Sequence, residues 1–134
     1  MAHYFRQAIE ETLPWLSSFG ADPTGGITRL LYSPEWLQAQ QAFKQRMSES
    51  GLETRIDEVG NLYGRLPGTR FPDEVILSGS HIDSVVNGGN LDGQFGALAA
   101  WLAVRWLKET YGAPLRTVEV LALAEEEGSR FPYV

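Results

Sequence analysis

The last sixty residues of the chain place a strand, a helix and a second strand in succession. The apolar run EVILSGS at residues 74–80 is typical of a short buried strand, and RTVEVLAL at residues 116–123 is typical of another. Residues 94–111 between them carry apolar side chains on one helical face, namely Phe95, Leu98, Leu102 and Trp106. This order predicts a parallel pair of strands with a right-handed crossover, and therefore an α/β fold.

Helices and a hairpin are predicted before this unit. Apolar residues at helical spacing indicate a helix over residues 5–16, which Pro14 is expected to kink or interrupt. A second helix is expected to be capped by Ser33, to start at Pro34 and to stop at Gly51. Residues 52–68 alternate in polarity on both sides of a glycine-containing turn, which predicts a β-hairpin.

Composition limits the classes of partner and of metal site. The net charge is -6, with 17 acidic and 11 basic residues and no run of lysine or arginine, which argues against nucleic acid or an anionic membrane as partner. The chain has no cysteine, so a metal must be held by nitrogen and oxygen ligands. No signal peptide or long apolar segment is recognised, and we therefore expect a cytoplasmic protein.

Polar side chains follow both strands of the strand–helix–strand unit. His81, Asp83 and Asp92 come after the first strand, and the acidic run Glu125–Glu127 comes after the second. Because the carboxyl ends of parallel strands meet at one edge of a sheet, we expect these two groups to converge there. Their convergence is the main sequence-based reason to expect a functional site.

Imidazole and carboxylate ligands suit zinc, manganese or a related divalent ion, and one carboxylate can bridge two ions. His81 and Asp92 are candidate ligands, and Asp83 could accept the second ring N–H of the histidine. One glutamate of the acidic run can bind metal while its neighbour takes a proton from water. The glycines Gly88, Gly89 and Gly93 would let the backbone turn tightly beside the ions. Two alternatives stay open on residues alone: a hydrogen-bonded loop histidine, and a solvated acidic patch.

Four segments of the chain also carry a family resemblance. GSHIDSVVNGGNLDGQFGALA at residues 79–99 and AEEEGSRF at residues 124–131 resemble the metal-dependent amidohydrolase branch of the M20 peptidase family. GGITRLLYSPEW at residues 25–36 and RIDEVGNLYGRLPG at residues 55–68 are similar to that branch too. The branch includes N-carbamoyl amino acid hydrolases, β-ureidopropionases and allantoate amidohydrolases, and the last of these are the most similar.

The resemblance implies a role for each candidate residue. His81 would bind one metal ion, Asp92 would bridge two, Glu127 would bind the second, and Glu126 would be the general base. Asp83 would orient the histidine from behind. Two divalent ions per intact site are therefore expected, zinc or manganese. Ser84 stands where the branch usually has threonine, a change that keeps the hydroxyl.

The resemblance also implies a fold, a reaction and a place within a longer protein. The expected fold is a zinc-peptidase-like catalytic domain with a largely parallel central sheet flanked by helices. The expected reaction is hydrolysis of a linear ureido C–N bond, with allantoate as substrate and with ammonia and carbon dioxide released. The alternatives are an N-carbamoyl-L-amino acid hydrolase and a non-catalytic remnant or interaction module.

In the branch, each metal gains a further histidine later in the sequence, and a later domain holds the substrate and forms a homodimer. We therefore expect residues 1–134 to be the truncated N-terminal part of the catalytic domain and to be inactive alone. No substrate-binding residue is assigned.

Overall fold

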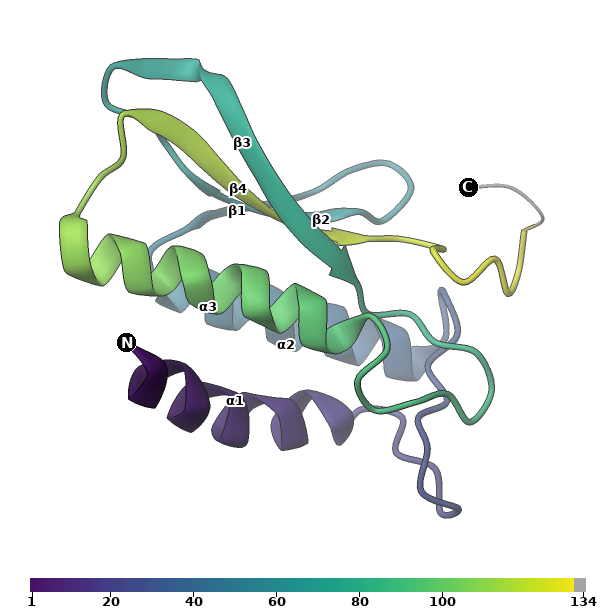
Figure 1. The fold of residues 1–134 in the computed structure, drawn as a ribbon. Helices are drawn as coiled ribbons and strands as arrows, with labels where there is room; N and C mark the ends of the chain where they lie inside the picture. Colours follow the sequence, from purple (N-terminus) through teal and green to yellow (C-terminus); the bar gives the residue numbers. More distant parts are fainter. Residues whose placement is uncertain (132–134) are drawn as a thin grey trace.

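The described part of the chain folds into three helices and a four-stranded sheet (Figure 1). The computed structural model describes residues 1–131. In chain order the elements are α1 (Ala2–Ser17), α2 (Pro34–Glu49), β1 (Glu53–Ile56), β2 (Leu62–Leu66), β3 (Phe71–His81), α3 (Gln94–Tyr111) and β4 (Arg116–Leu123).

The sheet is mixed, with strand order β1-β2-β4-β3. β3 and β4 are parallel and are joined by α3, which confirms the predicted strand–helix–strand unit. β1 pairs with β2 and β2 pairs with β4 in antiparallel fashion. The α/β class is confirmed, but one of the three strand pairings is parallel where a largely parallel sheet was predicted. The short connection between β1 and β2 can only return the chain antiparallel, which accounts for the first of the two antiparallel pairings.

All three helices lie on one side of the sheet in Figure 1. α3 packs on β3 and β4, α2 packs on β1 and β2, and α1 packs on α3. The buried core lies between these layers, and its largest apolar side chains are Leu16, Leu31, Phe43, Met47, Leu62, Leu98, Trp101 and Leu102. The expectation of helices flanking the sheet on both sides is therefore not met within residues 1–131. No helix in this part of the chain is long and apolar enough to cross a membrane.

The predicted helix signals and the hairpin have clear outcomes. The Ser33 hydroxyl accepts a hydrogen bond from the Trp36 N–H at 3.1 Å, so it caps α2 as predicted. α2 ends before Gly51, whose φ is +90°. The hairpin is confirmed by the β1–β2 pairing. α1 is one helix that runs through Pro14, so the proline does not divide it into two helices.

β3 differs most from its prediction. It was expected to be a short buried strand, but it spans eleven residues and is mostly exposed. Val75, Ile76 and Leu77 are 49%, 56% and 52% exposed. β3 lies at the edge of the sheet, and neither face of its first part is covered by another element of residues 1–131. Its apolar composition is that of a buried strand, but burial depends on neighbours that the strand does not have here.

The apolar face of α3 also needs a correction. Leu98 and Leu102 are fully buried and Trp106 is half-buried, but Phe95 is 42% exposed. The buried face runs instead through Ala97, Leu98, Trp101 and Leu102. Phe95 lies in the first turn of the helix, beyond the cover that the sheet provides.

Candidate metal centre

The candidate site lies where β3 and β4 end. His81 is the last residue of β3 and is paired with Leu123, the last residue of β4. The acidic turn Glu125–Glu127 follows two residues later, and Asp92 lies in the loop just before α3. Because β3 and β4 are parallel, their carboxyl ends and both polar groups lie at the same edge of the sheet.

His81 is buried and its ring is oriented from one side. Its Nδ1–H donates to the backbone carbonyl of Asp83 at 2.9 Å, and the Asp83 Oδ1 lies 3.4 Å away. A carbonyl can only accept, so Nδ1 carries a proton, and Nε2 is the atom that can act as a ligand when the ring is neutral. The prediction named the Asp83 carboxylate as the partner, whereas the nearer atom is the backbone carbonyl of the same residue.

The Nε2 side of the ring faces three carboxylates. Asp92 Oδ1 lies 3.8 Å from Nε2, Glu126 Oε2 lies 3.3 Å away and Glu127 Oε1 lies 4.0 Å away. One ligand atom each from His81, Asp92 and Glu127 lie within 4.8 Å of one another. The structure therefore brings together the three residues named as metal ligands and the one named as general base.

The charges of this cluster favour a bound cation. Burial lowers the pKa of His81, but hydrogen bonding of the ring to Asp83 and the charges of Asp83 and Glu126 outweigh it and raise the pKa to about 9. Burial, together with the hydrogen bond and charge of Asp92, raises the pKa of Glu127. Carboxylates this close to one another repel, and a divalent cation between them would relieve the repulsion.

Asp83 has a second contact that ties the two loops together. Its side chain is fully buried, and Oδ2 accepts a hydrogen bond from the Glu127 N–H at 3.1 Å. Its Oδ1 has no hydrogen-bond partner among the described residues. One carboxylate therefore contacts the imidazole of His81 and also the backbone of Glu127.

Glu125 has a separate structural role in the acidic turn. Its φ is +60°, and its carboxylate accepts hydrogen bonds from the backbone N–H groups of Ser129, Arg130 and Phe131. These contacts direct the buried side chain away from His81, which faces Glu126 and Glu127 instead. Of the three glutamates, Glu126 therefore lies beside His81 but does not belong to the cluster of candidate ligands formed by His81, Asp92 and Glu127.

Gly93 is required by the geometry of the site. Its φ is +76°, and a Cβ there would lie 2.3 to 2.6 Å from three atoms of the His81 ring. Gly88 and Gly89 have no positive φ, so of the three loop glycines only Gly93 adopts the left-handed region that favours glycine.

Arg29 and Gln94 are both buried beside the loop, and neither was predicted to have a role in the site. The sequence does contain a signal that Arg29 is buried, because it is a lone arginine in the mostly apolar run ITRLL. Nothing local indicates its partners, which lie up to 65 positions away in the sequence.

Comparison with known proteins places the chain in a family. The sequence model of peptidase family M28 matches residues 61–131, more than half of the chain. The chain belongs to this family. The matched segment of this M28 member begins at β2 and contains β3, α3, β4 and all the candidate site residues.

Individual relatives refine the family assignment. The chain is 82% identical to the allantoate amidohydrolase of Escherichia coli (strain K12) over its whole length, which is 33% of that protein. It is 59% identical to the allantoate amidohydrolase of Bacillus subtilis (strain 168) over 127 residues, which cover 95% of this chain and 31% of that protein. The chain therefore spans about a third of the length of these relatives.

A solved structure confirms the fold. The crystal structure of a hydantoinase/carbamoylase family amidase from Burkholderia ambifaria matches 96% of this chain and 31% of that one, with a TM-score of 0.86 and 31% identity. The resemblance to the amidohydrolase branch is thereby confirmed, and the family model that matches is named M28.

Proposed function

We propose that residues 1–134 contribute to a metal-dependent hydrolase that cleaves a linear ureido C–N bond, with allantoate as its substrate. One observation carries the proposal: His81, Asp92 and Glu127 converge at the carboxyl edge of the parallel pair, with Glu126 beside them. The 82% identity to an allantoate amidohydrolase supports this substrate over others.

The donor set fits a divalent ion. Nε2 of His81 is free, the carboxylates of Asp92 and Glu127 surround it, and the cluster has no cation of its own once the ring is neutral. In this proposal His81 and Asp92 would hold one ion, and Glu127 would hold a second together with Asp92, the ions being zinc or manganese. A divalent ion there would acidify a water molecule and polarise the substrate carbonyl.

Glu126 performs the proton transfers. Its carboxylate is half-exposed, so substrate and water can reach it, and it lies on the Nε2 side of His81. It removes a proton from the attacking water and later delivers that proton to the leaving nitrogen. Asp83 keeps the proton of His81 on Nδ1 and holds the backbone of Glu127, which fixes both ligands in place.

Hydrolysis of the terminal ureido C–N bond of allantoate would release ammonia and leave a carbamate, which loses carbon dioxide to give a ureidoglycine-type product; a second water would convert this to a ureidoglycolate-type product with loss of a second ammonia. The rival substrate is an N-carbamoyl-L-amino acid. The similarity to a hydantoinase/carbamoylase family amidase supports this rival, but the sequence identity to that protein is only 31%. Both substrates present the same carbonyl chemistry, so a rate comparison is needed to choose between them.

The wider context of the site is part of the proposal. We place residues 1–134 in the N-terminal part of a catalytic domain, in a cytoplasmic homodimer that takes a small ureido substrate and binds neither nucleic acid nor membrane. Three ligands from this segment do not fill two coordination spheres, because catalytic zinc ions commonly take three protein ligands each. The remaining ligands and the substrate-binding residues would come from other parts of the protein.

The test is ammonia release by the complete natural protein, compared between allantoate and N-carbamoyl-L-amino acids. We expect allantoate to have the higher kcat/KM, and Glu126→Gln to lower kcat by roughly 10²- to 10⁴-fold while metal content is unchanged. Glutamine keeps the shape of the side chain but cannot accept the proton.

Glu125→Gln is the matched variant for this test. Because Glu125 accepts hydrogen bonds only within its own turn, we expect its substitution to lower stability more than turnover. Near-normal rates for Glu126→Gln with a collapse for Glu125→Gln would reverse the assignment of the base. A higher kcat/KM for N-carbamoyl-L-amino acids would reverse the assignment of the substrate.

A further inference from the structure

Arg29 is a buried arginine that bonds to both flanks of the loop carrying the candidate ligands. Arg29 is 1% exposed. Burial lowers the pKa of its guanidinium to about 10, so the group remains protonated at neutral pH. No acidic side chain of residues 1–131 forms an ion pair with it. Its hydrogen bonds go instead to carbonyl and amide oxygens, which is an unusual environment for a buried charge.

The guanidinium joins helix α1 to the residues on either side of the site. Nη2 donates to the Leu16 carbonyl at 2.5 Å and Nε donates to the Phe19 carbonyl at 2.9 Å, at the C-terminal end of α1. Nη1 donates to the Ile82 carbonyl at 3.1 Å and to Gln94 Oε1 at 3.2 Å. Ile82 directly follows His81, and Gln94 comes two residues after Asp92. One planar group therefore bonds to the chain beside each of two candidate ligands.

Gln94 extends this connection into the loop itself. The residue is 2% exposed, and its Nε2 donates to the Ser17 hydroxyl at 2.7 Å and to the Asn90 carbonyl at 2.5 Å. Its amide thus bonds to Arg29 on one side and to the backbone two residues before Asp92 on the other. The Asp92 side chain is 66% exposed, and the Asp92 carbonyl accepts a hydrogen bond from the Gln94 N–H at 2.9 Å.

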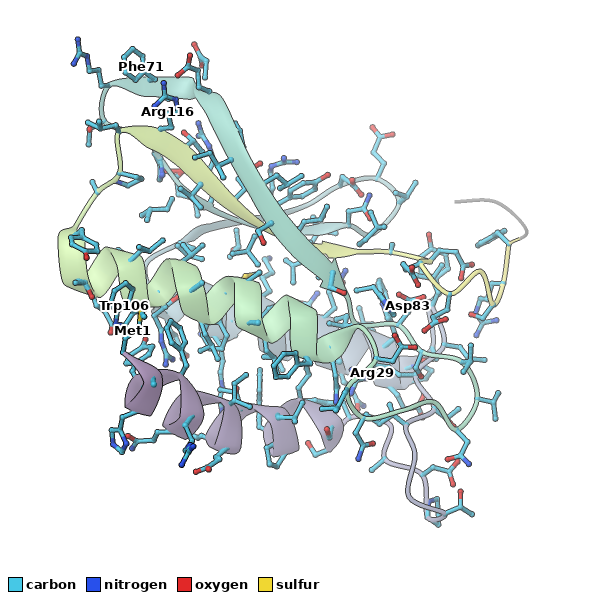
Figure 2. All side chains as sticks on the ribbon, in the orientation of Figure 1. Met1, Arg29, Phe71, Asp83, Trp106 and Arg116 are labelled. Carbon is cyan, nitrogen blue, oxygen red and sulfur yellow. The ribbon has the colours of Figure 1, made fainter. Side chains whose placement is uncertain are left out.

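The backbone of Arg29 adds a further pair of contacts to the same loop. Its N–H donates to the Ser84 hydroxyl at 2.8 Å, and its carbonyl accepts from the Ser84 N–H at 2.9 Å. In turn, the Ser84 hydroxyl donates to the Ile27 carbonyl at 3.0 Å. Figure 2 shows Arg29 and Asp83 at the same end of the molecule, near the point where β3 ends.

We infer that Arg29 is a positioning residue that sets the separation of His81 and Asp92, and thereby the affinity of the site for a divalent ion. The inference rests on the proposed function, because it takes these two residues as ligands. Arg29 touches neither ligand side chain. It acts through the Ile82 carbonyl and the Gln94 amide, and only a planar group with several fixed donors can reach both of them and the end of α1 together.

The test is manganese and cobalt affinity in the complete natural protein, measured by competition with a chelator, with the visible absorption spectrum of bound Co²⁺ as a second readout. We expect Arg29→Lys to weaken binding about 10- to 100-fold, as substitutions behind metal ligands commonly do, and to alter the Co²⁺ spectrum. Lysine keeps the positive charge but carries all its donors on one nitrogen atom, so it cannot span the same set of acceptors.

Arg46→Lys is the matched control. The Arg46 guanidinium packs on the Trp15 ring, with Cζ 3.9 Å from the ring centroid, and does not bond to the loop that carries Asp92. It should leave both the metal affinity and the spectrum unchanged. Gln94→Met is the second test variant and is used if Arg29→Lys does not fold. It removes the amide that bonds to Arg29 and to the Asn90 carbonyl, and it leaves Arg29 in place. It should weaken metal binding by a smaller factor and shift the Co²⁺ spectrum.

The outcomes separate this inference from the proposed function. Unchanged affinity and spectrum in both Arg29→Lys and Gln94→Met, with metal bound tightly by the natural protein, would overturn the role of Arg29 alone. Failure of the natural protein to bind divalent metal would overturn the metal site and this inference together.

Discussion

At the scale of single residues, the site depends on small side chains as well as on the ligands. Gly93 lies against the His81 ring with a backbone conformation that favours glycine. An alanine there would bring its methyl group into the ring of this candidate ligand and would also be strained by about 1–3 kcal/mol. We therefore expect Gly93→Ala to lower both the free energy of unfolding and the affinity for divalent metal.

Gly112→Ala is the control for Gly93→Ala. Gly112 has a similar φ of +79°, but a Cβ there would meet nothing within 4 Å. Its substitution should impose similar backbone strain while leaving the metal affinity unchanged. Calorimetric titration with Mn²⁺ together with thermal unfolding checks both variants, and equal metal affinities in the two would refute the close contact with His81.

Residues differ in how far the sequence could predict their place in the site. His81, Asp92 and Glu127 each follow a predicted strand or precede a predicted helix, so the order of elements alone indicated one common edge. The distinction between Glu125 and Glu126 depends on the left-handed conformation of Glu125 and its bonds to Ser129 and the residues after it. The sequence contains no local signal for that turn.

At the scale of elements, the hairpin is connected to the acidic turn. The β1–β2 loop ends at Asn61, whose Oδ1 accepts a hydrogen bond from the Ala124 N–H at 2.7 Å, directly before Glu125. The loop itself is organised by Asp57, whose Oδ1 accepts from the N–H groups of Val59, Gly60 and Asn61. Its Oδ2 accepts from the Asn61 amide at 2.8 Å. The hairpin thereby supports the turn that carries the candidate general base.

We expect Asp57→Ala to lower the free energy of unfolding by about 1–2 kcal/mol at pH 7, because several partly exposed hydrogen bonds are lost. Burial raises the pKa of Asp57, but the hydrogen bonds from Asn61, Val59 and Gly60 outweigh it and lower the pKa overall. A lowered pKa in the folded state means that this stabilisation is present above the unfolded value of 3.8 and is lost as the pH falls through the folded value.

Urea unfolding of Asp57→Ala and the natural protein at several pH values between 3 and 7 measures this effect. The difference in stability should shrink at the acidic end. Asp57→Asn is the control, because it keeps one acceptor oxygen and cannot ionise. A deficit for Asp57→Ala that stays constant down to pH 3 would contradict the role given to the carboxylate.

Element boundaries were predictable where local chemistry sets them. Ser33, Pro34 and Gly51 mark the ends of α2 as expected, and α3 spans Gln94–Tyr111 as predicted. The burial of β3 and the proportion of parallel pairing were not predictable, because both depend on which elements lie beside a strand. Pro14 lies in the last turn of α1, and the helix continues through it to Ser17.

At the scale of the whole molecule, residues 1–131 cover one face of the sheet and leave the other open. The helices lie on one side in Figure 1, and the apolar side chains of β3 are exposed within residues 1–131. The chain spans about a third of the length of its allantoate amidohydrolase relatives. The candidate site is likewise partial in the proposal, because three candidate ligands, His81, Asp92 and Glu127, would not fill the coordination spheres of two ions.

The central claim is that one carboxylate, that of Asp92, joins two metal ions at the edge of the sheet. Metal analysis of the purified complete natural protein and its Asp92→Ala variant tests this claim most directly. Asp73→Ala is the control, because Asp73 is an exposed residue in the first part of β3, at the opposite end of the strand from His81. We predict two divalent ions per chain in the natural protein and in the control, and neither ion in Asp92→Ala. Retention of two ions by Asp92→Ala would contradict the account.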